Sequence, residues 1–106
     1  MKTHYWKIKG IILPHILDGS KDLELRVGHY YVKLVQVGDI IIFNGQCGRK
    51  VVAIRDYPDF SSAVEKEDHS RIFPGRTKKW LLAKIKENFT AESERLGVLI
   101  FELGPC

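Results

Sequence analysis

The sequence predicts an α+β domain in which about five short strands form a small, partly open mixed barrel, with about three helices packed against it. Asp22–Val27 alternates apolar and charged residues, as a half-buried strand does. Ile40–Phe43 is a continuous apolar run typical of a buried strand. Thr77–Phe89 places its apolar residues at helical spacing. Because 106 residues can bury only one core, residues 1–106 are expected to form a single domain.

The first elements are separated by proline and glycine. Tyr5–Lys9 alternates loosely and predicts the first strand. Gly10–Asp18 has helical spacing, in which Pro14 suits the first turn and Gly19 suits the left-handed position after the last turn. Asp22–Val27 is then the second strand.

A hairpin is predicted in the middle of the chain. The connection at residues 28–36 has room for a helical turn. Ile40–Phe43 is expected to be buried on both faces because every residue in it is apolar. Asn44-Gly45 is a hairpin turn signal, and Gly48 indicates a loop longer than two residues. Lys50–Tyr57 is the expected return strand.

Helices dominate the next part of the sequence. Pro58 ends the return strand, and Asp59–Asp68 predicts a helix with Asp59 or Ser61 as its N-cap. Pro74-Gly75 is a firm break before the next helix.

The last part begins with the strongest helix signal, Thr77–Phe89, with Trp80 at the border of its apolar stripe. Thr90–Arg95 can add a helical turn. Gly97–Leu103 predicts the closing strand, which barrel closure would bring back beside the first strand.

Composition limits the classes of function. The net charge of +4 permits an anionic partner such as nucleic acid but does not require one. Cys47 and Cys106 form neither a disulfide framework nor a zinc site, and the four histidines lack the spacing of a metal site, so no metal or cofactor is expected. The charged, aromatic N-terminus and the short apolar runs predict no signal peptide and no membrane span, and hence a cytoplasmic protein.

The most informative segment is Gly19–Arg26, which holds a lysine, a glutamate and an arginine within six residues. Strand alternation places Glu24 and Arg26 on one face, where they can bind one ligand or each other. Lys21 lies at the turn, so alternation does not determine its direction. A solvated ion pair of little energetic value is the alternative to a ligand site.

Four motifs in order resemble the ASCH domain family, the activating-signal-cointegrator homology family of the PUA-like superfamily. Gly19-x-Lys21-x-x-Glu24-x-Arg26 resembles its G-x-K-x-x-E-x-R signature, and Val37–Phe43 resembles its second block. The helix and P-G block, and the final strand, have their counterparts in residues 57–75 and 97–101. The resemblance covers nearly the whole chain, as expected of a small stand-alone prokaryotic-type member.

The resemblance implies a PUA-like barrel and a cleft, lined by the signature residues, that binds RNA or a nucleotide-like ligand. Some small bacterial relatives are instead amidohydrolases that act on N4-acetylcytidine, using the motif lysine, a threonine three residues later and a glutamate after the first long helix. Carried over to this chain, the lysine is Lys21 and the late glutamate is Glu67, but the threonine position holds Glu24. A glutamate that is ionised only accepts hydrogen bonds, so the hydrolase mechanism does not transfer intact.

Two classes of function therefore stay open, with an adaptor that has lost its ligand as a third. In a binding module, Arg26 would hold a phosphate or a base edge and Glu24 would accept from an amine or hold Lys21. In an enzyme, Lys21, Glu24 and Glu67 would be catalytic. If both glutamates approach Lys21, they favour its charged form, which suits electrostatic stabilisation better than proton abstraction.

Further basic residues can form an RNA backbone surface or simply a solvated helix face. The members of this set proposed as binding residues are Arg49, Lys50, Arg76, Lys78 and Lys79. Tyr5 and Trp6 can stack a base, but the alternating first strand places one of them in the core. The oligomeric state is not determined by the sequence.

Overall fold

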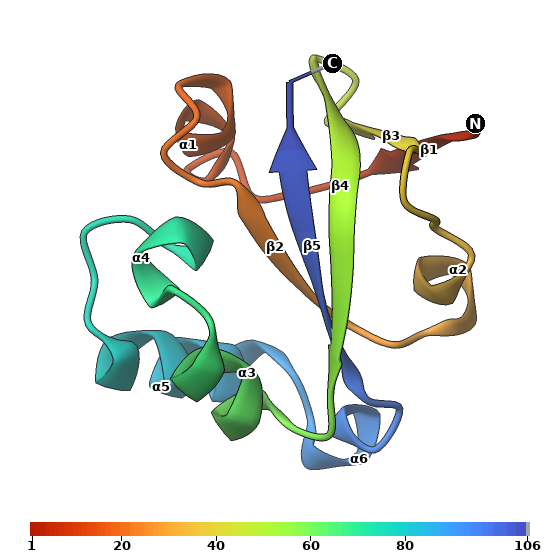
Figure 1. Cartoon of the computed structure of the whole chain (residues 1–106). Coiled ribbons are helices and arrows are strands. Elements are labelled where there is room, and N and C mark those ends of the chain that lie inside the picture. The colour runs from red at the N-terminus through yellow and green to blue at the C-terminus, as the bar shows by residue number, and fades with distance from the viewer. Residues whose placement is uncertain (106) are drawn as a thin grey trace.

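The computed structural model describes residues 1–105, so the expectation for Cys106 lies outside the described residues. Six helices and five strands alternate irregularly along this part of the chain (Figure 1). In chain order they are β1 (Thr3–Trp6), α1 (Leu13–Leu17), β2 (Leu23–Val27), α2 (Tyr30–Lys33), β3 (Ile40–Phe43), β4 (Cys47–Tyr57), α3 (Phe60–Lys66), α4 (His69–Ile72), α5 (Lys78–Asn88), α6 (Ala91–Glu94) and β5 (Val98–Gly104).

The strands form one mixed sheet in the order β1-β3-β4-β5-β2, in which β1 and β3 are parallel and the other neighbours are antiparallel. The expectation that the last strand lies beside the first is wrong, because β5 lies between β4 and β2. Five of the seven residues of β5 are buried, as suits a strand with a neighbour on each side. Three of the four residues of β1 are not buried, as suits an edge strand, whereas the other edge strand, β2, is buried at four of its five positions.

Local signals located most elements. Pro14 lies in the first turn of α1, and Gly19 has the left-handed φ of 82° predicted for it. Asp59 caps α3 by accepting a hydrogen bond from the amide of Ser62, and Thr77 caps α5 in the same way through Trp80. The first strand begins two residues earlier than expected, because pairing with β3 starts at Thr3.

The prediction that β3 is buried on both faces is wrong. Ile41 and Phe43 are fully buried, but Ile40 and Ile42 are only half-buried. The helices of the second half contact β2, β4 and β5, so the second face of β3 lacks the cover of a helix (Figure 1). Apolar residues at all four positions therefore did not indicate burial of all four.

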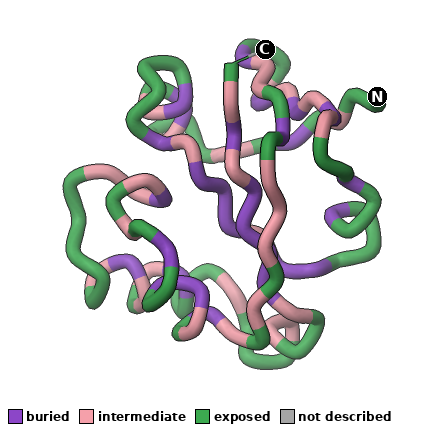
Figure 2. Tube along the Cα trace, in the orientation of Figure 1, coloured by how far each residue is buried: buried purple, intermediate pink, exposed green. Residues whose placement is uncertain are grey.

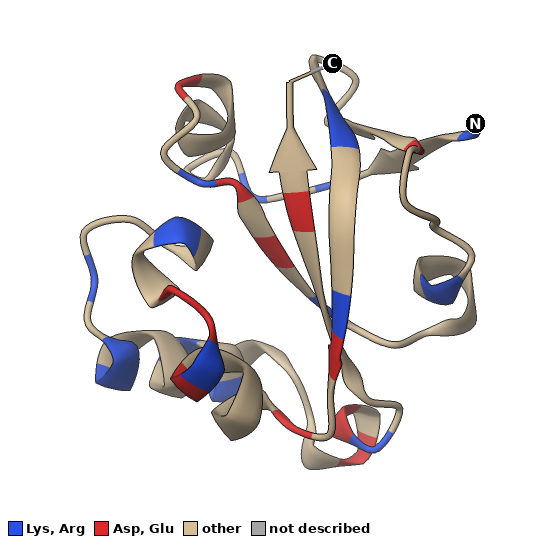
Figure 3. Ribbon diagram, viewed as in Figure 1, with Lys and Arg blue, Asp and Glu red and all other residues tan. Residues whose placement is uncertain are grey.

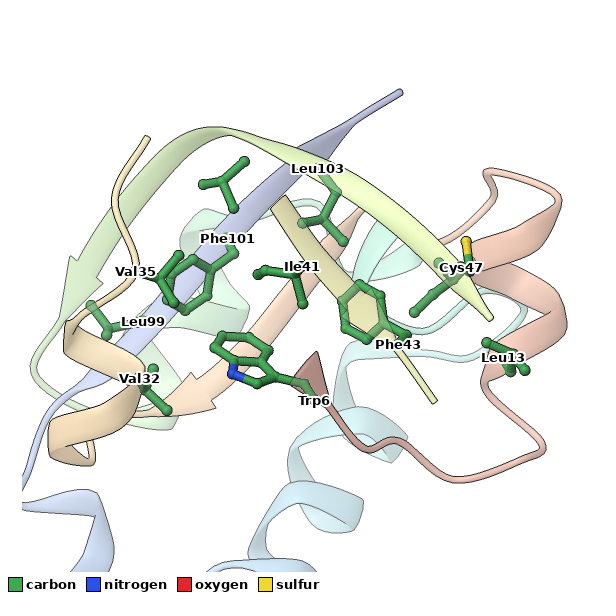
Figure 4. Close-up of a cluster of buried hydrophobic side chains, with 12 residues drawn as sticks. Trp6, Leu13, Val32, Val35, Ile41, Phe43, Cys47, Leu99, Phe101 and Leu103 are labelled. Carbon is green, nitrogen blue, oxygen red and sulfur yellow. The ribbon is translucent and has the colours of Figure 1, made fainter. Parts of the chain in front are cut away.

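The central sheet separates two apolar cores (Figure 2). Leu99 and Phe101 of β5 point to the first core, where Trp6 packs edge-on against Phe43 and Phe101 (Figure 4). Val98 and Ile100 point to the second core, which α3 and α5 cover. Because neighbouring residues of β5 face different cores, every residue paired with β5 can be assigned to one face.

The described part of the chain holds neither a helix that could span a membrane nor a cluster of metal-binding side chains. Within residues 1–105, no helix is both long and apolar enough to cross a membrane. Over the same residues, no three His, Cys, Asp or Glu side chains gather closely enough to hold a metal ion. Cys47 is a free, buried cysteine of the first core.

Candidate functional site

The motif lysine, Lys21, is buried and uses all of its donors within the protein. Its Nζ donates to the backbone oxygens of Leu23, at 2.7 Å, and of Ile72, at 2.8 Å. Its third partner is Oε1 of Glu24, at 3.0 Å. A lysine ammonium has three N–H donors, so these three partners occupy Lys21 fully and it positions its neighbours. The bond to Ile72 also attaches the end of α4 to the beginning of β2.

The carboxylate of Glu24 contacts both other charged residues of the motif, Lys21 and Arg26. Its Oε2 accepts a hydrogen bond from Nε of Arg26 at 2.8 Å and lies 2.7 Å from Nη2 of the same arginine. Burial by itself raises the pKa of this carboxyl, but the charges and hydrogen bonds of Lys21 and Arg26 outweigh burial and leave the pKa below its ordinary value. Glu24 is thus a buried carboxylate with both oxygens occupied, and it cannot replace a nucleophilic threonine.

Arg26 connects the two edge strands of the sheet. Its guanidinium carbon lies 4.6 Å from the centre of the Trp6 ring in β1, and Nη2 donates to the backbone oxygen of Lys7 at 3.1 Å. The side chain is 19% exposed. The contacts made with residues 1–105 use Nε and Nη2, which leaves the two N–H groups of Nη1 for another partner.

A hollow of about 370 Å³ opens on the face of the sheet that carries Arg26. Arg26 is the cross-strand neighbour of Leu99, and Leu99 and Phe101 line the hollow. Lys33 and Asp56 supply its charged lining. The remaining lining residues are apolar, namely Val32, Val35 and Ile54. A second hollow, of about 410 Å³, lies between Pro58 and α6. Lys21, Glu24 and Arg26 are not among the lining residues of either hollow.

Glu67 lies on the opposite face of the sheet from Glu24. Nε and Nη2 of Arg55 donate to its two carboxylate oxygens at 2.7 and 2.8 Å, and the Tyr57 hydroxyl donates to Oε2. Arg55 pairs with Ile100, which faces the second core, whereas Glu24 pairs with Phe101, which faces the first. The approach of both glutamates to Lys21, considered from the sequence, is therefore wrong, because only Glu24 reaches it.

The surroundings of Glu67 form a second charged network that the sequence did not indicate. The Arg55 hydrogen bonds, helped by Tyr57, hold the pKa of Glu67 below its ordinary value against the effect of burial. Arg55 also donates to Glu102 of β5 at 3.0 Å. Arg71 makes two bonds to Asp22, at 2.6 and 2.9 Å. Arg71 and Asp22 are 49 residues apart in the sequence, so nothing local could have predicted this pairing.

The predicted basic residues do not gather in one place. Arg49 donates to the backbone oxygens of Ile16 and Leu17 and so caps the end of α1, while Lys50 is exposed on β4. Arg76, Lys78 and Lys79 are exposed at the beginning of α5. Among them, Arg76 lies over the Trp80 ring, with its guanidinium carbon 4.8 Å from the ring centre.

Solved structures share this architecture from end to end. The crystal structure of hypothetical protein PH0355 matches with a TM-score of 0.91 and 28% sequence identity, over 100% of both chains. The solution structure of protein PF0455 from Pyrococcus furiosus matches with a TM-score of 0.80 and 26% identity, over 99% of this chain and 97% of its own. No protein-family model matches the sequence. A search of curated proteins also finds no match. The similarity supports the fold, and neither name states an activity.

Proposed function

We propose that the chain is an ASCH-like, PUA-like module that binds RNA or a nucleotide-like ligand beside Arg26. One observation carries this proposal: a half-buried arginine, fixed by Glu24, the Lys7 carbonyl and the Trp6 ring, keeps the Nη1 donors unused, and its cross-strand neighbour Leu99 lines a hollow. Binding sites for small ligands combine an apolar cavity with a few fixed polar groups. The side-chain bridge between β1 and β2 also suits the small open barrel of that superfamily.

Each motif residue has a distinct role in this proposal. Arg26 offers Nη1 to a phosphate oxygen or to a base carbonyl, because a guanidinium suits both acceptors. Lys21 and Glu24 are positioning residues, since their own donors and acceptors are occupied within the protein. The apolar floor of the hollow would cover a base, and Lys33 and Asp56 would contact its polar edge or the ribose.

The amidohydrolase alternative has no observation in its favour. The Nζ of Lys21 is held by two backbone oxygens and Glu24, Glu24 stands in the threonine position, and Glu67 is bound to Arg55 and Tyr57. Incubation of the purified protein with N4-acetylcytidine, followed by detection of cytidine, tests it directly. Release of cytidine that is lost in Lys21→Ala would replace the binding proposal with the enzyme.

The binding test is an NMR titration of ¹⁵N-labelled protein with short RNA at low salt. We expect the side-chain Nε–H of Arg26 and the indole N–H of Trp6 to shift, since both belong to the proposed site. In Arg26→Lys, which keeps one positive charge but lacks the Nη1 donors, the affinity should fall. Lys2→Ala is the matched control, because it removes an exposed charge from β1's N-terminal flank. An absence of RNA binding, or equal affinity in Arg26→Lys, would overturn the proposal.

A further inference from the structure

Four side chains form a row that runs from α1 past the end of α4 to the beginning of α5. The ring of His15 lies 6.2 Å from that of Phe73, and Phe73 lies 4.8 Å from Trp80, both as centroid distances. Arg76 then covers the Trp80 ring. The three rings are half-buried and Arg76 is exposed, so the row is partly accessible to solvent.

The row is anchored from below. Phe73 and Trp80 both pack against the second core, and Trp80 is further fixed because its amide donates to the capping oxygen of Thr77. Rings that the protein already holds in place lose little conformational freedom when a ligand stacks on them. The core thus holds the two central rings of the row, Phe73 and Trp80, in place.

Positive charge predominates in the segment that carries this four-residue platform. Residues 69–86 contain no Asp or Glu, and Lys and Arg positions are blue on α4 and α5 in Figure 3. The six cations of this segment are Arg71, Arg76, Lys78, Lys79, Lys84 and Lys86. Two acidic side chains from outside this segment lie nearby, since Asp22 pairs with Arg71 and Glu65 lies 3.9 Å from Lys78. The first turn of α5 has no acidic residue, although the partial positive charge of a helix N-terminus favours one there. This concentration of positive charge is complementary to a polyanion.

The platform is joined to the motif site through Lys21. The Nζ of Lys21 bonds to the backbone of Ile72, the residue before Phe73, and to Glu24, which holds Arg26. Because Lys21 and Glu24 are buried, this connection lies inside the protein.

We infer that this surface, defined by His15, Phe73, Arg76 and Trp80, stacks the unpaired bases of single-stranded RNA while Lys78 and Lys79 contact its phosphates. The inference rests on the proposed function, because it names the strand state of the same ligand. Unpaired bases stack on aromatic rings and on arginine guanidinium planes, and Arg76 over Trp80 offers both in one stack. Bases within a duplex have no free face, so double-stranded RNA should bind more weakly.

The two tryptophans make the test specific, since Trp6 reports on the Arg26 site and Trp80 reports on the platform. Short single-stranded RNA of mixed sequence is added to the ¹⁵N-labelled protein, and the same strand annealed to its complement is added in parallel. We expect the single strand to shift the Trp80 indole N–H and to bind more tightly than the duplex.

Two variants identify the stacking contribution. Trp80→Leu should weaken binding of the single strand about 5- to 150-fold, the range expected for one stacked base. Arg76→Ala, at an exposed position, should weaken it several-fold and carries the test if Trp80→Leu does not fold. Arg95→Ala removes another exposed arginine that lies over no ring in residues 1–105, and it is expected to bind almost as the unaltered protein does.

The outcomes separate this inference from the proposed function. A single strand that shifts Trp6 but leaves Trp80 unmoved overturns the platform and leaves the Arg26 site intact. A shift of Trp80 alone supports the platform and overturns the Arg26 site. Equal affinity for single strand and duplex, or equal losses in Arg76→Ala and Arg95→Ala, also overturns the platform. If RNA shifts the indole N–H of neither tryptophan, both the platform and the Arg26 site are overturned.

Discussion

The chain has two tryptophans, and each has an arginine over its ring, but the two pairs differ in every other respect. Trp6 is 6% exposed, and Arg26 above it is bound to Glu24 and to the Lys7 carbonyl. Trp80 is half-buried, and Arg76 above it is exposed and pairs with no carboxylate among the described residues. The same two residue types thus make a buried connection in one region and an open surface in the other.

The difference shows that partners and burial decide what an arginine on a tryptophan does. A buried guanidinium must be paired, because an unpaired buried charge is costly, and its pairing then joins β2 to β1. An exposed guanidinium is hydrated and stays available to a ligand. Removing the same chemical groups from the two regions should therefore have very different effects on folding and on binding.

The largest effect is expected when the carboxylate beneath Arg26 is removed. Glu24→Ala leaves Lys21 with a buried ammonium and Arg26 without its anchor, so the free energy of unfolding should fall by about 3–5 kcal/mol. Urea unfolding followed by circular dichroism measures it. Glu65→Ala is the control, since Glu65 is exposed and lies only near Lys78, at 3.9 Å. A loss no greater than that of the control would contradict the buried network.

The next largest effect on the free energy of unfolding is expected from removal of Arg26, compared with removal of Arg76. Arg26→Ala should lower the free energy of unfolding by about 2–3 kcal/mol, because its bonds to a charged group are lost and Glu24 keeps only Lys21. Arg76→Ala should cost less than about 1 kcal/mol, the value of an exposed cation–π contact. Thermal or urea unfolding of both variants gives the ratio. Equal losses of unfolding free energy in the two variants would contradict a difference between the Arg26–Trp6 pair and the Arg76–Trp80 pair.

Acid should reduce the contribution of Glu24 to the free energy of unfolding. Because the pKa of Glu24 is lower in the folded protein, its contribution is present above the ordinary glutamate value of about 4.3. That contribution is lost as the pH falls through the lower, folded value. In Glu24→Gln this carboxyl no longer titrates, so the free energy of unfolding should depend less steeply on pH below about pH 4.3. An unchanged pH profile in Glu24→Gln would contradict the lowered pKa.

The smallest expected effect on folding, and a clear effect on binding, belongs to the lysines of the surface region. Lys78→Ala/Lys79→Ala should leave the free energy of unfolding almost unchanged. The slope of log affinity for single-stranded RNA against log salt should become shallower by about 1.4, or about 0.7 for each lost phosphate contact. Fluorescence anisotropy at several salt concentrations measures it. Lys2→Ala/Lys9→Ala is the charge-matched control, and an equal change of slope there would mean that the attraction is not localised.

Local chemistry made much of the fold predictable. The proline, glycine and capping signals of α1, α3 and α5 act within a few residues, and the alternation of β2 correctly placed Glu24 and Arg26 on one face. The helix α4 was not predicted, although Asp68 caps it by accepting a hydrogen bond from the amide of Ser70. The pairing of Arg71 with Asp22 and the bond from Lys21 to Ile72 join residues 49 and 51 positions apart, so no local signal indicates them.

The proximity of the motif residues was predictable in part, but the geometry around them was not. The sequence by itself determined that Lys21, Glu24 and Arg26 are neighbours on a turn and one strand, because spacing along a strand is a local property. Only the tertiary structure decided that Glu67 faces the other core, that Trp6 lies beneath Arg26 and that Trp80 stays at the surface. Which face meets which core depends on the order of the strands, and that order results from contacts between residues distant in the sequence.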